Sequence, residues 1–199
     1  MWAVLLAAFV NASVGGVPIA IMEPAGQVAL SNRESPYFKS LADRGPNRIL
    51  AAFVTPDDVM GVDTGGAKPR GEWSLVSGLQ RDEPISNDFF RSKVVPAIES
   101  ATVEGARREA SKERSMKIEI EQMIGAFSKG ERHVCHGVVS RVETANGSPQ
   151  RIVKIIGSVN VRDRLVTLAL SRAVESENDI ASAKAKCTAW AEAMVKSNP

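Results

Sequence analysis

The sequence predicts an α+β domain in which helices pack on an antiparallel sheet, and three observations lead to this fold class. Aliphatic and β-branched residues fill three strand-length segments near the end of the chain, at 134–142, 152–161 and 165–170. The connections are short: Asn146-Gly147 suits a type I′ hairpin turn because both residues tolerate positive φ, and Arg162-Asp163 forms a second tight connection. The segment that follows has apolar residues at the spacing of one helical stripe, namely Ile180, Ala183, Cys187, Trp190 and Met194. A three-stranded meander closed by a C-terminal helix is therefore expected.

Composition fits a globular protein and disfavours one class of partner. The 199 residues are 44% hydrophobic and 24% charged, and they suffice for one substantial domain. The 25 basic and 23 acidic side chains are interspersed, and aromatic residues make up only 5%. Nucleic-acid binding proteins normally carry a basic face and aromatic stacking platforms, so we expect no nucleic-acid partner.

The N-terminal region has the pattern of an export leader. An apolar run at 2–10 precedes the small residues of 11–16, and candidate cleavage sites follow Ala12 and Gly16. This predicts a leader over 1–16 and a single domain over 17–199, in the periplasm or secreted. The run is too short to span a membrane, so the mature chain should have no integral membrane span. No Lys or Arg precedes the run, and the alternative interpretation is a buried N-terminal helix or strand.

The first half of the chain predicts further strands at 17–30, 48–54 and 72–77, giving a sheet of about five or six strands in all. A short helix is expected from Ser35-Pro36 to Asp43, and a single helical turn at 55–58. The segment 61–71 has four glycines and no periodicity, which predicts a surface loop. Its Gly65-Gly66-Ala67-Lys68 lacks the Gly-Lys-Ser/Thr order of a phosphate-binding loop.

A long helix is predicted in the middle of the chain. Ser86 suits its N-cap, and the helical pattern continues to about Met123. Pro96 should kink it, since proline removes a hydrogen bond and clashes with the preceding turn. The mixed charges of 107–117 are typical of a solvated helix face.

The candidate site residues are few. His133-Val134-Cys135-His136 holds both histidines of the chain, but a strand places 133 and 135 on one face and 136 on the other, so no metal site is predicted. Cys135 with His133 as base would be a minimal nucleophile pair. The more strongly indicated role for Cys135 is a disulfide with Cys187, which the helical stripe places against the sheet. Two buried thiols in a reducing compartment are the alternative.

Motifs of common catalytic sites are missing from the sequence. It contains no Gly-x-Ser-x-Gly, His-Glu-x-x-His or Gly-x-Gly-x-x-Gly pattern. We therefore expect a protein without catalytic residues or a cofactor.

A family resemblance rests on two groups of segments. The run 161–169, followed by Asn178-Asp179-Ile180 and by 190–194, looks like the ending of small uncharacterised exported proteins of Gram-negative bacteria, and 46–54 is similar to their first core strand. The order of elements over about 20–198 also resembles the PsbP-like fold, an α/β/α sandwich around an antiparallel sheet. The resemblance implies a fold and an envelope location, and no activity.

Two functions are consistent with these features. The favoured hypothesis is an exported, non-enzymatic protein that binds a protein partner or supports the envelope as an accessory. The alternative is a small-molecule-binding or hydrolytic enzyme with a pocket between the sheet and the long helix.

Overall fold

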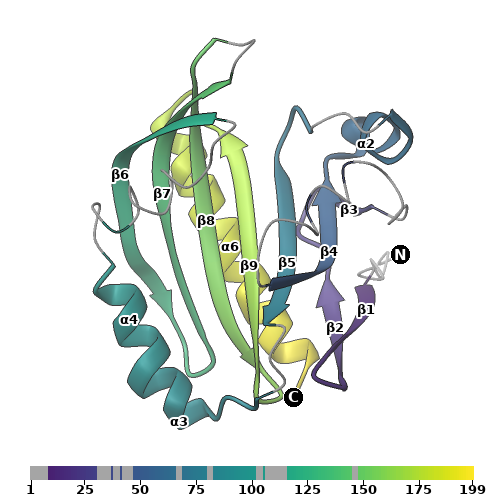
Figure 1. Cartoon of the computed structure of the whole chain (residues 1–199), viewed down its shortest axis with the longest axis vertical. Helices are drawn as coiled ribbons and strands as arrows, with labels where there is room; N and C mark the ends of the chain where they lie inside the picture. The colour runs from purple at the N-terminus through teal and green to yellow at the C-terminus, as the bar shows by residue number, and fades with distance from the viewer. Residues whose placement is uncertain are drawn as a thin grey trace, which may run out of the picture.

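A computed structural model describes residues 9–30, 37, 41, 47–65, 69–79, 83–101, 105, 116–144 and 148–199. Its strands and helices follow one another along the chain in the order shown in Figure 1. They are β1 (Phe9–Val14), β2 (Val17–Met22), β3 (Val28–Ala29), β4 (Asn47–Val54), the 3-10 turn Pro56–Asp58, α2 (Val59–Gly65), β5 (Trp73–Leu79), α3 (Asn87–Phe89), the π-helical turn Phe90–Val94, α4 (Val95–Glu99), β6 (Met116–Lys129), β7 (His133–Thr144), β8 (Gln150–Val161), β9 (Arg164–Ala173) and α6 (Glu177–Ser197). No helix among these described residues is long and apolar enough to cross a membrane.

The described strands form an antiparallel seven-stranded sheet in the order β3-β4-β5-β9-β8-β7-β6, and a separate β1–β2 hairpin. The expected meander is confirmed as β7, β8 and β9. Arg162 and Asp163 join β8 to β9 with φ of 49° and 58°, the left-handed conformation that a two-residue hairpin turn requires. The Asn146-Gly147 turn lies outside the described residues.

Helix α6 covers one face of the sheet and crosses behind β8 and β9 in Figure 1. Its predicted stripe is confirmed, because Ile180, Ala183, Cys187, Trp190 and Met194 are all buried. They pack against alternate residues of the meander strands, such as Val159 and Leu168. Ser176 begins the helix in a capping box with Asp179, which satisfies backbone donors that the first turn leaves free.

The C-terminal half of α6 also covers the outer edge of β2. The Asn198 amide clamps Ala20, accepting from its N–H at 2.8 Å and donating to its carbonyl at 2.9 Å. Trp190 Nε1 donates to the Met22 carbonyl at 2.7 Å, and Arg162 donates to that of Pro18 at 3.2 Å. These side chains take the place of a neighbouring strand, so β2 has no open edge on this side.

The β1–β2 hairpin overlaps the predicted leader. Val14 of β1 and Ile19 and Ile21 of β2 are buried in the same core as α6. A cut after Gly16 would remove Val14 from this core, and a cut after Ala12 would leave Val14 but remove residues 9–12 of β1. Whether 1–16 is a leader stays a prediction. In this structure residues 9–14 form a strand in which only Val14 is buried.

The opposite face of the sheet carries a second, smaller core. Leu30, Ala52, Val54 and Val62 pack there, and Val62 comes from α2. The prediction of a loop over 61–71 is wrong at its start, because α2 continues to Gly65. Burial of Val62 outweighs the low helix propensity of the glycines.

Helices α3 and α4 lie beside the ends of β6 and β7 (Figure 1). Ser86 caps α3 as predicted, its hydroxyl accepting from Phe89 N–H. Pro96 does not break the helix, because a π-helical turn precedes it. In this turn the Val95 N–H donates to the Phe90 carbonyl, and the wider turn accommodates the proline, which has no N–H to donate.

The prediction that the helix continues to Met123 is wrong. Met116–Lys129 forms the edge strand β6, and the sheet has seven strands in place of the expected five or six. Bulges at Ile120/Gln122 and Ile124/Ser128 interrupt its alternation and hide the strand pattern in the sequence. The expected helix at 36–43 is described only at Tyr37 and Leu41, which are both helical.

We expect Trp190→Ala to lower the free energy of unfolding by about 3–5 kcal/mol, because it empties a core position. Trp190 is 3% exposed, and its ring packs edge-to-face with the Phe53 ring at a centroid distance of 5.9 Å. Denaturant titration measures the loss, and Trp190→Phe is the matched control that keeps an aromatic ring while losing the hydrogen bond to Met22. A native-like midpoint for Trp190→Ala would contradict this packing.

Candidate functional site

A groove lies between β1 and β4 on the described surface. It consists of two adjoining hollows of about 320 and 370 Å³ that share Ser13, Arg48 and Leu50. The complete lining is Asn11, Ala12, Ser13, Val14, Gly15, Arg48, Leu50, Gly78 and Leu79. This groove, called the β1–β4 groove below, lies away from both sequence-predicted cysteines and histidines.

The edge of β1 turns its peptide groups toward the β1–β4 groove. Val14 pairs with Val17 across a two-glycine turn, Gly15-Gly16, whose φ values of 55° and 74° favour glycine. In such a hairpin the closing pair is hydrogen-bonded, and alternate residues direct their N–H and C=O groups outward. Asn11 and Ser13 are these outward residues, and Pro18, which lacks an N–H, lies opposite Ser13. No ladder joins the described parts of β1 and β4.

One end of the groove is closed by a close contact that depends on a glycine. A Cβ built on Gly78 would lie 2.8 Å from Val14 Cγ2 and 3.3 Å from Leu50 Cδ1. Gly78 thus leaves space for the Val14 side chain, which anchors the hairpin to the sheet.

Apolar and basic groups stand at the rim of the groove. Leu79, which lines the groove, is 39% exposed. Arg48 is exposed, and no described carboxylate forms a salt bridge with it. The rim therefore combines an exposed apolar side chain with a positive charge that no carboxylate among the described residues pairs.

Sequence reasoning missed this groove because 11–15 was interpreted as part of a leader. Gly15-Gly16 between two apolar runs is itself a hairpin signal and could have indicated β1 and β2.

The structure brings Cys135 and Cys187 together in the main core. Their Sγ atoms are 3.4 Å apart, and both residues are fully buried as free thiols. This separation exceeds the roughly 2.05 Å of a disulfide bond. The disulfide therefore stays a prediction, while the proximity of β7 and α6 that motivated it is found.

The two histidines lie on opposite faces of β7, as the strand alternation predicted. His133 is 8% exposed on the α6 side, its ring held over Gly130, where a Cβ would lie 2.5 Å from Cε1. Burial lowers the pKa of His133, and Glu192 on α6 partly opposes this. Burial also lowers the pKa of His136. Among the described residues, no group of three or more His, Cys, Asp or Glu side chains could hold a metal ion.

His133 also contacts a hydroxyl. Its Nε2 lies 3.2 Å from Ser128 Oγ across the β6–β7 hairpin, a nucleophile–base distance that the sequence analysis did not foresee. Neither hollow of the β1–β4 groove includes these residues. The contact between Ser128 and His133 lies at the turn of the hairpin. There the Gly130 N–H also donates a hydrogen bond to the His133 carbonyl.

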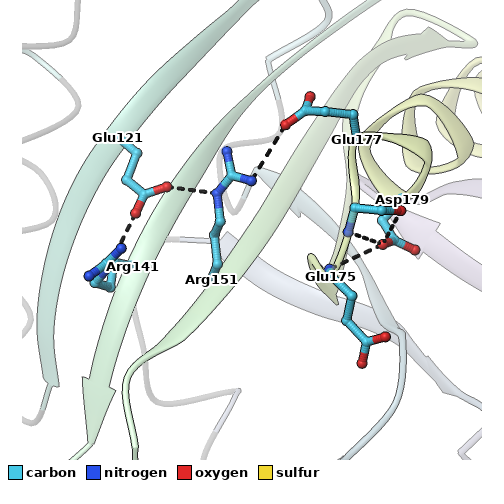
Figure 2. A network of polar contacts seen from close by, with 7 residues as sticks. Glu121, Arg141, Arg151, Glu175, Glu177 and Asp179 are labelled. Atoms are coloured by element: carbon cyan, nitrogen blue, oxygen red, sulfur yellow. Dashed lines mark hydrogen bonds and ion pairs between the residues drawn. The ribbon is translucent and has the colours of Figure 1, made fainter.

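Charged side chains connect the start of α6 to the sheet (Figure 2). Glu121 on β6 binds Arg141 at 3.2 Å and Arg151 at 2.8 Å, and Arg151 reaches Glu177 of α6 at 3.5 Å. The Arg151 hydrogen bond lowers the pKa of Glu121, assisted by that of Arg141. The backbone N–H groups of Ser176 and Glu175 lower the pKa of Asp179. These carboxylates are engaged in holding the helix.

A second ionic cluster lies deeper. Glu72, before β5, contacts Lys186 of α6, Arg172 of β9 at 3.6 Å and the Gln27 amide at 2.9 Å. Its side chain is only 10% exposed. This cluster joins four segments that are distant in sequence and is a structural element of the fold.

Comparison with known proteins gives similarity of fold only. No protein-family model matches the chain, and no curated protein does. Among solved structures, cyanobacterial PsbP from Synechocystis sp. PCC 6803 is similar at a TM-score of 0.43 and 13% identity, over 94% of this chain and 95% of that one. The Ran-binding protein Mog1p of Saccharomyces cerevisiae is similar at a TM-score of 0.35 and 11% identity, over 96% and 93%. The predicted resemblance to the PsbP-like fold is thus found, as a weak one.

Both histidines should make stability depend on pH. Their folded pKa values lie below the unfolded value of about 6.5, so the unfolded chain binds protons first. The contribution of the two histidines to the free energy of unfolding should be constant above about pH 7.5 and fall as the pH drops below about 6.5, by at most about 1.4 kcal/mol per pH unit per histidine.

Urea titrations from pH 8 to 5 measure this slope. The His133→Gln/His136→Gln double variant is the control and should be flatter between pH 7 and 5.5. Equal slopes in the two proteins would show that the histidines do not cause the pH dependence of the free energy of unfolding.

Proposed function

We propose that this chain is an exported accessory protein, periplasmic or secreted, that binds an extended segment of a partner protein in the β1–β4 groove without catalysing a reaction. The observation that carries the proposal is a groove lined by the outer strand β1 on one side and by β4 and β5 on the other. The proposal requires that export leaves β1 in place, without cleavage after Ala12 or Gly16, because β1 forms one wall of the groove and Val14 belongs to the core.

The chemistry of the groove favours an added strand as the occupant. Outward peptide groups at Asn11 and Ser13 can pair with an extended backbone, which supplies affinity in this mode of recognition. Leu79 offers an apolar contact at the rim. Arg48 lacks a described carboxylate partner, so the segment should carry an acidic side chain opposite it.

The other chemistry-bearing groups have structural roles that leave them little freedom for catalysis. The thiols are buried in the core, His133 closes a hairpin, and Glu72, Glu121 and Asp179 are paired. The hydrolytic alternative would depend on Ser128 and His133, and the shallow groove lies elsewhere. In an oxidising compartment, Cys135 and Cys187 would be joined as a disulfide.

Site-specific photo-crosslinking in the native host tests the proposal. A photoreactive amino acid at position 79 should give a discrete adduct with another protein, whereas one at position 60, on the highly exposed Met60 of α2, should not. Arg48→Glu should reduce the adduct about tenfold or more. Arg91→Glu, a charge reversal on an exposed residue of the π-turn, is the matched control and should leave the adduct unchanged.

Fractionation of the same cells provides the second readout. The chain is expected in the periplasm or medium, with an N-terminus at or before Phe9. An intact Met1 in the cytosol would refute export, and a start at Ser13 or Val17 would remove the groove. An adduct of twice the chain's mass would mean that the groove contacts a second copy of this chain, and would refute binding of a different partner. An adduct that Arg48→Glu does not reduce would refute an acidic side chain opposite Arg48.

A further inference from the structure

The pair Cys135 and Cys187 is placed for a covalent bond that the folded protein has not formed. Cys135 lies on β7 and Cys187 in the middle of α6, and their sulfurs are 3.4 Å apart. The sulfurs would need to approach by more than about 1 Å to bond. A bond here would tie the closing helix to the sheet at the centre of the core.

Gly157 on β8 leaves room for that approach. A Cβ at this position would lie 3.2 Å from the Cys187 sulfur and 3.5 Å from the Cys135 sulfur. An alanine Cβ would crowd the Cys187 sulfur and make ordinary contact with the Cys135 sulfur. The neighbouring strand therefore provides, at this one position, the space in which the two thiols face each other.

The same packing closes the pair to reagents. Disulfide exchange passes through a mixed disulfide, in which one protein sulfur is bonded to the oxidant. Both cysteines are 0% exposed, so no second molecule can reach either sulfur in the folded state. The hydrogen bond to Cys135 and burial raise the pKa of the Cys187 thiol, which makes the reactive thiolate scarce.

Exposing the pair requires α6 to leave the sheet. The helix is held at its start by Arg172, which binds Asp179 at 2.7 Å, and at its end by the clamp between Asn198 and Ala20. Arg132, from the β6–β7 turn, also donates to the carbonyls of Val195 and Asn198. Between these ends lies Trp190, so removing α6 opens the main core.

We propose that Cys135 and Cys187 form a folding-gated disulfide site, in which the bond forms before or during the docking of α6 and not afterwards. The inference rests on the proposed function only for its oxidant, because export would supply a disulfide donor during folding. One thiolate attacks the donor disulfide and releases its first thiol. The second thiolate then attacks the mixed disulfide and releases the other thiol. The two cysteines lose two protons and two electrons, and the donor becomes two thiols.

The test compares one reduced full-length sample in two states. One portion stays native and the other is unfolded in denaturant, and both receive oxidised glutathione. The second portion is then diluted to refold. Samples are quenched with an alkylating reagent at intervals and weighed by mass spectrometry, and thermal unfolding of each product is recorded.

Oxidation of the native sample should be more than about a hundredfold slower than that of the unfolding-and-refolding sample, since only a small unfolded fraction reacts. The refolded sample should lose two hydrogens, resist alkylation and unfold at a higher temperature. Gly157→Ala should lower the yield of this bond, and Cys187→Ser should give only a glutathione adduct. A native rate within a hundredfold of the unfolded rate, or a refolded sample without the internal bond, would overturn the proposal. This result in vitro does not depend on where the chain is found in cells. A failure of the disulfide proposal can therefore be distinguished from a failure of the export proposal.

Discussion

The docking of α6 on the sheet is the constraint on which the rest of this fold depends. One stripe of the helix fills the face of β7, β8 and β9, and the same helix presents Trp190 and Asn198 to the edge of β2. A two-stranded hairpin alone is only marginally stable in water. Because α6 side chains satisfy the outer edge of β2, the hairpin becomes part of the domain without joining the seven-stranded sheet.

This arrangement also explains why the groove exists. The β1–β2 hairpin is fixed to α6 by β2 and to the sheet by Val14, which enters the space above Gly78. No ladder joins the described residues of β1 and β4, although both strands line the groove. The helix thus holds β1 near β4 and β5, and Arg48 and Leu79 complete the candidate site.

The sequence predicted the parts of the fold whose local pattern agrees with their environment. Alternation in β7, β8 and β9 and the stripe of α6 are direct consequences of one buried face, and Arg162-Asp163 could only be a turn. In β6, two bulges break the alternation, and its Glu and Lys residues have high helix propensity, so pairing with β7 decides the outcome. Helix α2 similarly depends on Val62 finding its small core.

The candidate site was less predictable, for a physical reason. The Cys135–Cys187 proximity followed from two local patterns that share one interface, and the structure brings these residues together. The β1–β4 groove is lined by residues 11–15, 48, 50, 78 and 79, which only the tertiary fold brings together. In addition, an apolar run has the same composition in a leader and in a strand. In this structure residues 9–14 form a strand whose Val14 reaches the core, which the composition of the run does not predict.

Native-state hydrogen exchange tests most directly the claim that α6 holds the hairpin in the fold. The amide of Ala20 donates to the Asn198 side chain at 2.8 Å, outside any strand ladder. If α6 secures this edge, the Ala20 amide should exchange with the same free energy and denaturant dependence as the central amides of β8, such as that of Ile155. Exchange of Ala20 through a separate opening of low free energy, while β8 stays protected, would contradict the account.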